Sequence, residues 1–140
     1  RAMNKALKKS VVFAIAVGAM ITMAVQSSSI TTSLIVPMCG SGILSLEAAF
    51  PVMLGANIGT TITAFLASLA TDKNGLVIAL VHVIFNTIGI VGILIIPRAR
   101  QIPIVLAEGL AARAVRNKIW VIAYVFIMFL VIPLLGILLF

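Results

Sequence analysis

From residue 11 to residue 96 the sequence carries only three charged residues, Glu47, Asp72 and Lys73. A water-soluble domain is about half apolar and a quarter charged, whereas this chain of 140 residues is 63% hydrophobic and 9% charged. One small core cannot bury so much apolar surface. In a bilayer, by contrast, apolar side chains face lipid while helices satisfy their own backbone hydrogen bonds. The sequence therefore predicts an all-α integral membrane protein with no separate soluble domain.

The net charge of +7 comes from two basic clusters, residues 1–9 and residues 98–118, which contain nine of the ten Lys and Arg residues. Both clusters flank apolar stretches, as basic residues do on the cytoplasmic face of membrane proteins. Such residues also bind anionic lipid headgroups. Neither cluster has the interleaved aromatic residues on which bases stack. We therefore expect the lipid bilayer as a partner, and no nucleic acid.

Residues 10–43 contain two short apolar arms on either side of a polar interruption. The first arm, residues 11–25, would form a helix about 22 Å long, which is short of the hydrocarbon core of about 30 Å. The second arm, residues 30–43, is also too short and contains one proline and two glycines. Non-helical backbone at membrane depth requires surrounding protein or a water-filled cavity. The arm lengths predict a re-entrant helical hairpin over residues 10–43, although two full crossings would leave the same charge balance.

Three further segments are long enough to cross a bilayer, namely residues 44–70, 76–96 and 118–140. We expect the first to be a broken transmembrane helix, because Pro51 and nearby glycines interrupt it. The last has a milder break near Pro133. Residues 102–117 mix apolar and charged side chains, which predicts an interfacial helix.

This order of segments satisfies the positive-inside rule. If residues 1–9 lie inside and the hairpin re-enters, the turn at residues 71–75 faces outside and residues 98–118 return inside. Lys73, beside Asp72, is then the one basic residue outside. The segments predict a multi-pass protein of the plasma membrane or bacterial inner membrane.

The polar interruption is Gln26-Ser27-Ser28-Ser29, and Thr31, Thr32 and Ser33 follow it. Hydroxyls and free carbonyls are oxygen ligands that can replace the hydration shell of Na⁺. A helix that restarts after a break points free N–H groups and a positive dipole end at the gap, so an anion can bind there without Lys or Arg. Hydroxyls also simply hold helices together in lipid. Six hydroxyls and an amide within eight residues favour a site, because polar groups at bilayer depth are costly.

A second motif is Gly55-Ala56-Asn57-Ile58-Gly59-Thr60-Thr61. It fits an unwound helix whose carbonyls face a cavity, with Asn57 able to donate and accept. Gly55 and Gly59 could equally form a close helix-packing face of the small-xxx-small kind. Beside the first motif, we favour the paired broken segments that secondary transporters use.

His82 and Asn86 lie four residues apart on one helical face. They could form a proton-sensitive gate, but we favour a hydrogen bond between helices. One His, one Cys and three acidic residues cannot form a standard transition-metal site, and no Gly-Lys-Ser phosphate loop is present. We expect no cofactor.

In this order, the Gln26–Ser29 motif with Thr32-Ser33, the Gly55–Thr61 motif, and His82 with Phe85-Asn86 resemble the type II sodium/phosphate cotransporter family. The resemblance covers residues 14–96. It implies two inverted repeats, each with a Gln-Ser-Ser-Ser motif in a re-entrant hairpin, of which this chain resembles the second. A single repeat supplies half a site, so we expect the chain to be part of a longer parent.

The resemblance further implies sodium-coupled symport of inorganic phosphate, with Na⁺ as the coupling ion and the second inverted repeat as a partner. It places phosphate or Na⁺ at Gln26, Ser27, Ser28 and Ser29. Thr32, Ser33, Asn57, Thr60 and Thr61 would complete the ion shells. The Na⁺ ligands would include Ser28, Ser29, Thr32 and Asn57.

Three other functions compete with phosphate symport. The chain could be a membrane assembly module without transport activity, or half of a transporter for another small anion. A serine hydrolase using His82 is disfavoured, because the serine run lacks a nucleophile-elbow pattern. We therefore expect a transporter rather than an enzyme.

Overall fold

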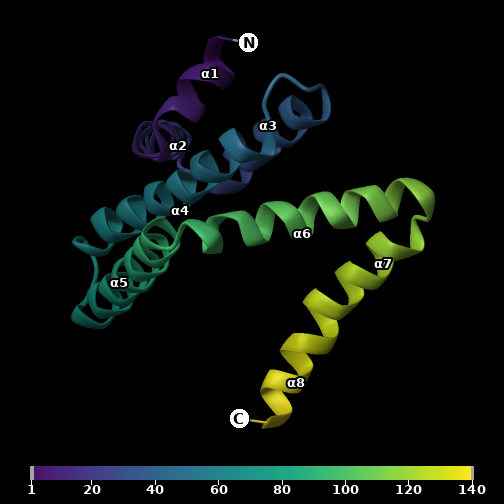
Figure 1. The fold of residues 1–140 in the computed structure, drawn as a ribbon. Coiled ribbons are helices and arrows are strands. Elements are labelled where there is room, and N and C mark those ends of the chain that lie inside the picture. Colours follow the sequence, from purple (N-terminus) through teal and green to yellow (C-terminus); the bar gives the residue numbers. More distant parts are fainter. Residues whose placement is uncertain (1, 140) are drawn as a thin grey trace. The chain divides into compact units, whose positions relative to one another are not determined.

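The computed structural model describes residues 2–139, and every element in that part of the chain is helical (Figure 1). The chain divides into two compact units, residues 1–97 and residues 98–140. Three of the described helical segments are long and apolar enough to cross a membrane, namely Leu46–Ser68, Lys73–Ile95 and Ile119–Leu139. The predicted class, an all-α integral membrane protein, is confirmed.

The first unit begins with α1 (Ala2–Lys9), α2 (Val11–Val25) and α3 (Ser28–Gly40). Ser10 starts α2, because its side chain accepts a hydrogen bond from the backbone N–H of Phe13, which would otherwise lack a partner. Ala14 near the start of α2 and Ile35 in the second half of α3 share one buried cluster. The two short helices therefore run antiparallel as a hairpin. Its re-entrant placement in a bilayer stays a prediction.

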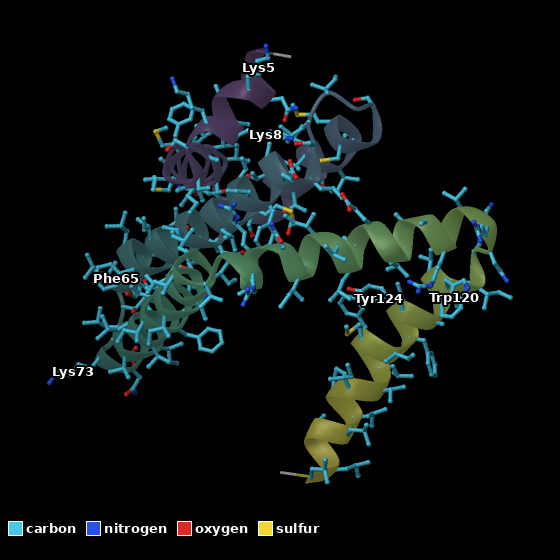
Figure 2. All side chains as sticks on the ribbon, viewed as in Figure 1. Lys5, Lys8, Phe65, Lys73, Trp120 and Tyr124 are labelled. Carbon is cyan, nitrogen blue, oxygen red and sulfur yellow. The ribbon has the colours of Figure 1, made fainter. Side chains whose placement is uncertain are left out.

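The longest helices of the first unit are α4 (Leu46–Ser68) and α5 (Lys73–Ile95). α4 packs against α2, α3 and α5, so it forms the centre of this unit (Figure 1). Asp72 caps α5 by accepting from the N–H of Gly75 at 3.0 Å. An ion pair joins α1 to the start of α4. The Lys8 ammonium, labelled in Figure 2, lies 2.6 Å from the Glu47 carboxylate.

The break that the sequence predicts within residues 44–70 is wrong, since α4 is one continuous helix. Pro51 lies in the second turn and removes a single backbone donor. The glycines serve close packing instead of unwinding. A Cβ atom on Gly55 would lie 2.0 Å from the carbonyl oxygen of Ile15, and one on Gly18 would lie 2.0 Å from that of Val52. The small-xxx-small alternative therefore describes this helix.

The second unit begins at the second residue of α6 (Pro97–Arg116) and continues with α7 (Ile119–Phe126), a π-helical turn (Ile127–Val131) and α8 (Ile132–Leu139). The last three run on without a gap. The π turn ends just before Pro133, whose ring cannot donate to the preceding turn and would clash with it. One wider turn relieves that clash. The interfacial position expected for residues 102–117, all but the last of which lie within α6, stays a prediction.

Candidate functional site

The polar motif lies where α2 ends and α3 begins. Gln26 ends α2 in the left-handed region, with φ 55° and ψ 27°, and it is the one non-glycine residue with positive φ in the described part of the chain. Ser27 is extended and caps α3, because its Oγ accepts from the N–H of Ile30 at 3.3 Å. The carbonyl end of one helix and the N–H end of another thus meet at Gln26 and Ser27. Such a junction offers oxygen ligands to a cation and donors to an anion.

Ser28 and Ser29 occupy the first turn of α3, and Thr32 and Ser33 follow in the next. Ser28 and Thr32 are half-buried, whereas Ser29 and Ser33 are exposed, as is Gln26. These four hydroxyl residues lie within the first two turns of α3. The sequence motif therefore forms one local cluster of donors and acceptors.

Two buried threonines link the arms behind this cluster. The Oγ1 atoms of Thr22 on α2 and Thr31 on α3 lie 2.9 Å apart, and both residues are almost fully buried. The Thr31 hydroxyl also donates to the carbonyl oxygen of Ser27 at 3.2 Å. A hydroxyl has one proton, so Thr22 donates to Thr31 in turn. This relay fixes the backbone of Ser27, the residue at the break.

Thr22 is absent from the site that the sequence predicts, and Thr31 appears there only as part of the hydroxyl run. A signal for Thr22 was available, since it is the one hydroxyl residue between residues 11 and 25. It also lies four positions before Gln26, on the same helical face. Single threonines are nevertheless common in apolar membrane helices, so this residue alone does not indicate a site.

The second motif meets the first through Thr22. A Cβ atom on Gly59 would lie 2.8 Å from the Cβ of Thr22 and 2.6 Å from the carbonyl oxygen of Ala19. Ile15 opposes Gly55, and Ala19 opposes Gly59 one helical turn farther along both helices. The structure thus brings the Gly55–Thr61 motif to the wall of the hairpin.

The hydroxyls of this second motif bond to their own helix. Thr60 donates to the carbonyl oxygen of Ala56 at 3.1 Å, and Thr61 donates to that of Asn57 at 2.7 Å. The predicted unwound carbonyls are thus part of a regular helix. Asn57 is exposed, Thr60 is half-buried and Thr61 is buried.

α5 contributes one polar contact to this region. Asn86 Nδ2 donates to the Thr61 Oγ1 at 2.7 Å, which is the hydrogen bond between helices that the sequence favours for the pair of His82 and Asn86. His82 itself is exposed. Within the described residues, no group of three or more His, Cys, Asp or Glu side chains is placed to hold a metal ion.

Residues 1–136 match the sequence model of the Na⁺/Pi-cotransporter family. The chain belongs to the Na⁺/Pi-cotransporter family. It is 48% identical over 125 residues to sodium-dependent phosphate transport protein 2B of Bos taurus, a match that covers 86% of this chain and 18% of that protein. The corresponding protein 2B of Homo sapiens is 45% identical over 125 residues, with 86% and 18% covered. Protein 2A of Rattus norvegicus is 43% identical over 125 residues, with 86% and 20% covered.

The chain spans about a fifth of the length of these curated relatives. No solved structure matches it. Within this Na⁺/Pi-cotransporter family chain, the Gln-Ser-Ser-Ser motif is the place where helical backbone ends and restarts, between Val25 and Ser28.

Proposed function

We propose that this chain supplies one half of a sodium-coupled phosphate transporter of the cell membrane. The observation that carries the proposal is the helix break at Gln26 and Ser27, in which two helix ends of opposite partial charge face one polar cluster. The relatives are named sodium-dependent phosphate transport proteins, and membership of the family supports the same cargo here.

In this proposal phosphate binds at the start of α3. Free N–H groups of the first turn and the hydroxyls of Ser28 and Ser29 would donate to its oxygens. From residue 10 to residue 72 the sequence has no Lys or Arg. The charge of phosphate would therefore be balanced by the helix end and by bound Na⁺, which couples phosphate binding to sodium.

Sodium would bind beside the anion through oxygen atoms. The proposed ligands are Ser28, Ser29 and Thr32 on α3 and Asn57 on α4. Gln26, Ser27 and Ser33 would complete the shells around both ions, and Thr60 and Thr61 would help to complete the shell around Na⁺. Thr60 and Thr61 donate to carbonyls of α4, so in this conformation their hydroxyl oxygens can act only as acceptors toward a cation.

The other half of the site would come from a second inverted repeat, and transport would follow alternating access around the shared site. An assembly module without transport activity is less well supported. The glycine face that would attach such a module to a partner is covered by α2 within the chain, where Gly55 meets Ile15.

The test is phosphate uptake into proteoliposomes by the complete transporter that contains this chain, with and without a Na⁺ gradient. We expect uptake to require Na⁺, and Ser28→Ala with Ser29→Ala to raise the phosphate concentration needed for half-maximal uptake. The matched control is Ser41→Ala, because Ser41 is an exposed serine at the opposite end of α3. Uptake that is indifferent to Na⁺, or equal effects of the two sets of variants, would contradict the proposal.

A further inference from the structure

A basic hollow lies on the last turns of α6, in the second unit. Arg113, Arg116, Gly109 and Ala112 line it, and its volume is about 420 Å³. Gly109 and Ala112 leave the space open because they carry little or no side chain. Both arginines are exposed, so the hollow presents two permanent positive charges.

Neighbouring groups hold Arg113 in place. Its Nη1 donates to the carbonyl oxygen of Gly109 at 3.3 Å, and its guanidinium lies 5.9 Å from the ring centroid of Trp120. A guanidinium has five N–H donors, so this single hydrogen bond leaves most of them available. Stacking near an aromatic ring orients the planar group while its edge stays open to an acceptor.

The position of the hollow along the chain indicates which kind of anion it would bind. The candidate span Ile119–Leu139 starts directly after the hollow, and tryptophan at the end of a span favours the headgroup level of a bilayer. The positive-inside rule assigns residues 98–118 to the cytoplasmic leaflet, in which anionic lipids are concentrated. Glu108, the one carboxylate of α6, is not among the residues that line the hollow.

We propose that this hollow binds the phosphate headgroup of an anionic phospholipid. The two guanidinium groups would contact the headgroup oxygens, and the acyl chains would lie along the exposed apolar side chains of α7, such as Ile119 and Ile122. A free phosphate ion offers the same oxygens but has no use for that apolar surface. The lipid is therefore the partner that fits both parts, and the inference does not depend on the transport function.

The sole tryptophan of this chain reports on the site directly. The purified chain, carrying Trp120, is reconstituted into phosphatidylcholine bilayers that contain a small fraction of brominated phosphatidylglycerol or, in parallel, brominated phosphatidylcholine. Bromine quenches nearby indole fluorescence. We expect about fivefold enrichment of the anionic lipid around Trp120 for each arginine, with quenching that reaches a plateau at a low mole fraction.

Two sets of variants separate a site from general charge. Arg113→Gln with Arg116→Gln should remove the preference for the anionic lipid, whereas Arg98→Gln with Arg100→Gln, which removes the same charge from the other end of α6, should retain it. Equal quenching by the two brominated lipids in the unmodified chain would overturn the proposal, as would equal losses in both double variants. A Trp120 response to inorganic phosphate in pure phosphatidylcholine, together with loss of the lipid preference when phosphate is added to the bilayers that contain phosphatidylglycerol, would assign the hollow to the free ion instead.

Discussion

The hydroxyl oxygens of Thr22 and Thr31 lie 2.9 Å apart and join the two arms of the hairpin behind the break. The Thr31 hydroxyl in turn donates a hydrogen bond to the carbonyl oxygen of Ser27 at 3.2 Å. The polar motif is thus held by a buried hydrogen-bonded pair on the protein side of the break, while the hydroxyls of Ser28 and Ser29 stay available for ions.

Thr22→Val should destabilise the protein by about 1 kcal/mol. The substitution keeps the shape of the side chain but removes the donor to Thr31, and Thr31 keeps its hydrogen bond to the Ser27 carbonyl oxygen, so the loss is that of one buried hydrogen bond. The measurement is thermal unfolding in detergent of the transporter that contains this chain. Thr87→Val is the control, since Thr87 is exposed on α5. Equal unfolding temperatures for the two variants would show that the pair contributes no stability.

Gly55→Ala should destabilise the protein by about 3 kcal/mol, because overpacking of a close contact forces the backbone apart. The added methyl group would lie 2.0 Å from the carbonyl oxygen of Ile15, which is backbone and cannot move alone. Gly89→Ala is the matched control, because a Cβ there meets no atom within 4 Å. It should stabilise α5 by about 0.5–1 kcal/mol through the lower entropy of its unfolded chain. Similar behaviour of both variants in an unfolding assay would argue against the α2–α4 contact.

Gln26→Gly separates the backbone role of Gln26 from its side-chain role. Glycine adopts positive φ without strain, so we expect stability within about 1 kcal/mol of the parent chain. Gln26→Val should be destabilising by about 1–2 kcal/mol, since a β-branched residue strongly resists the left-handed region. Sodium-driven phosphate uptake by the Gly variant then measures how much the side-chain amide of Gln26 contributes to transport. We expect this variant to lose uptake while it keeps its stability. Normal uptake in the Gly variant would remove the side chain from the site.

Asn86→Ala should weaken the contact between α4 and α5 at a cost of about 1 kcal/mol, the typical net contribution of one hydrogen bond. Its partner, Thr61 Oγ1, still donates to the carbonyl oxygen of Asn57, so the loss is limited to a single interaction. His82→Ala lies one turn away on the same helix and should change stability by less than about 0.5 kcal/mol. Thermal unfolding of both variants checks the assignment, and a larger effect at His82 would contradict it.

Much of the architecture follows from lengths and composition. The first arm is a short apolar helix that ends at Val25 because a polar run follows, and Ser27 has the residue type that starts a new helix. The spans were recognisable because uninterrupted apolar runs of this length have few other uses. In these places each local preference agrees with the global fold.

The helix through Gly55 and Gly59 shows why the rest could not be predicted. A glycine in an apolar segment allows the backbone to unwind and equally allows another helix to approach. Only the carbonyl oxygen of Ile15, 2.0 Å from where a Cβ would be, decides between the two, and that neighbour is far away in sequence. The role of Thr22 could not be predicted for a similar reason, because its hydrogen-bond partner Thr31 lies on the other arm of the hairpin.

The π-helical turn at Ile127–Val131 has a consequence for whatever packs along the last span. A regular helix advances about 100° for each residue, so one additional residue in a turn shifts the angular phase of everything that follows. The face of α7 that carries Trp120 and Tyr124 therefore does not continue straight along α8, because the residues after the π turn are rotated about the helix axis. A partner that packs along both faces must therefore be two helices or one curved helix. Deleting one residue from the π turn would align the two faces into a single straight packing surface.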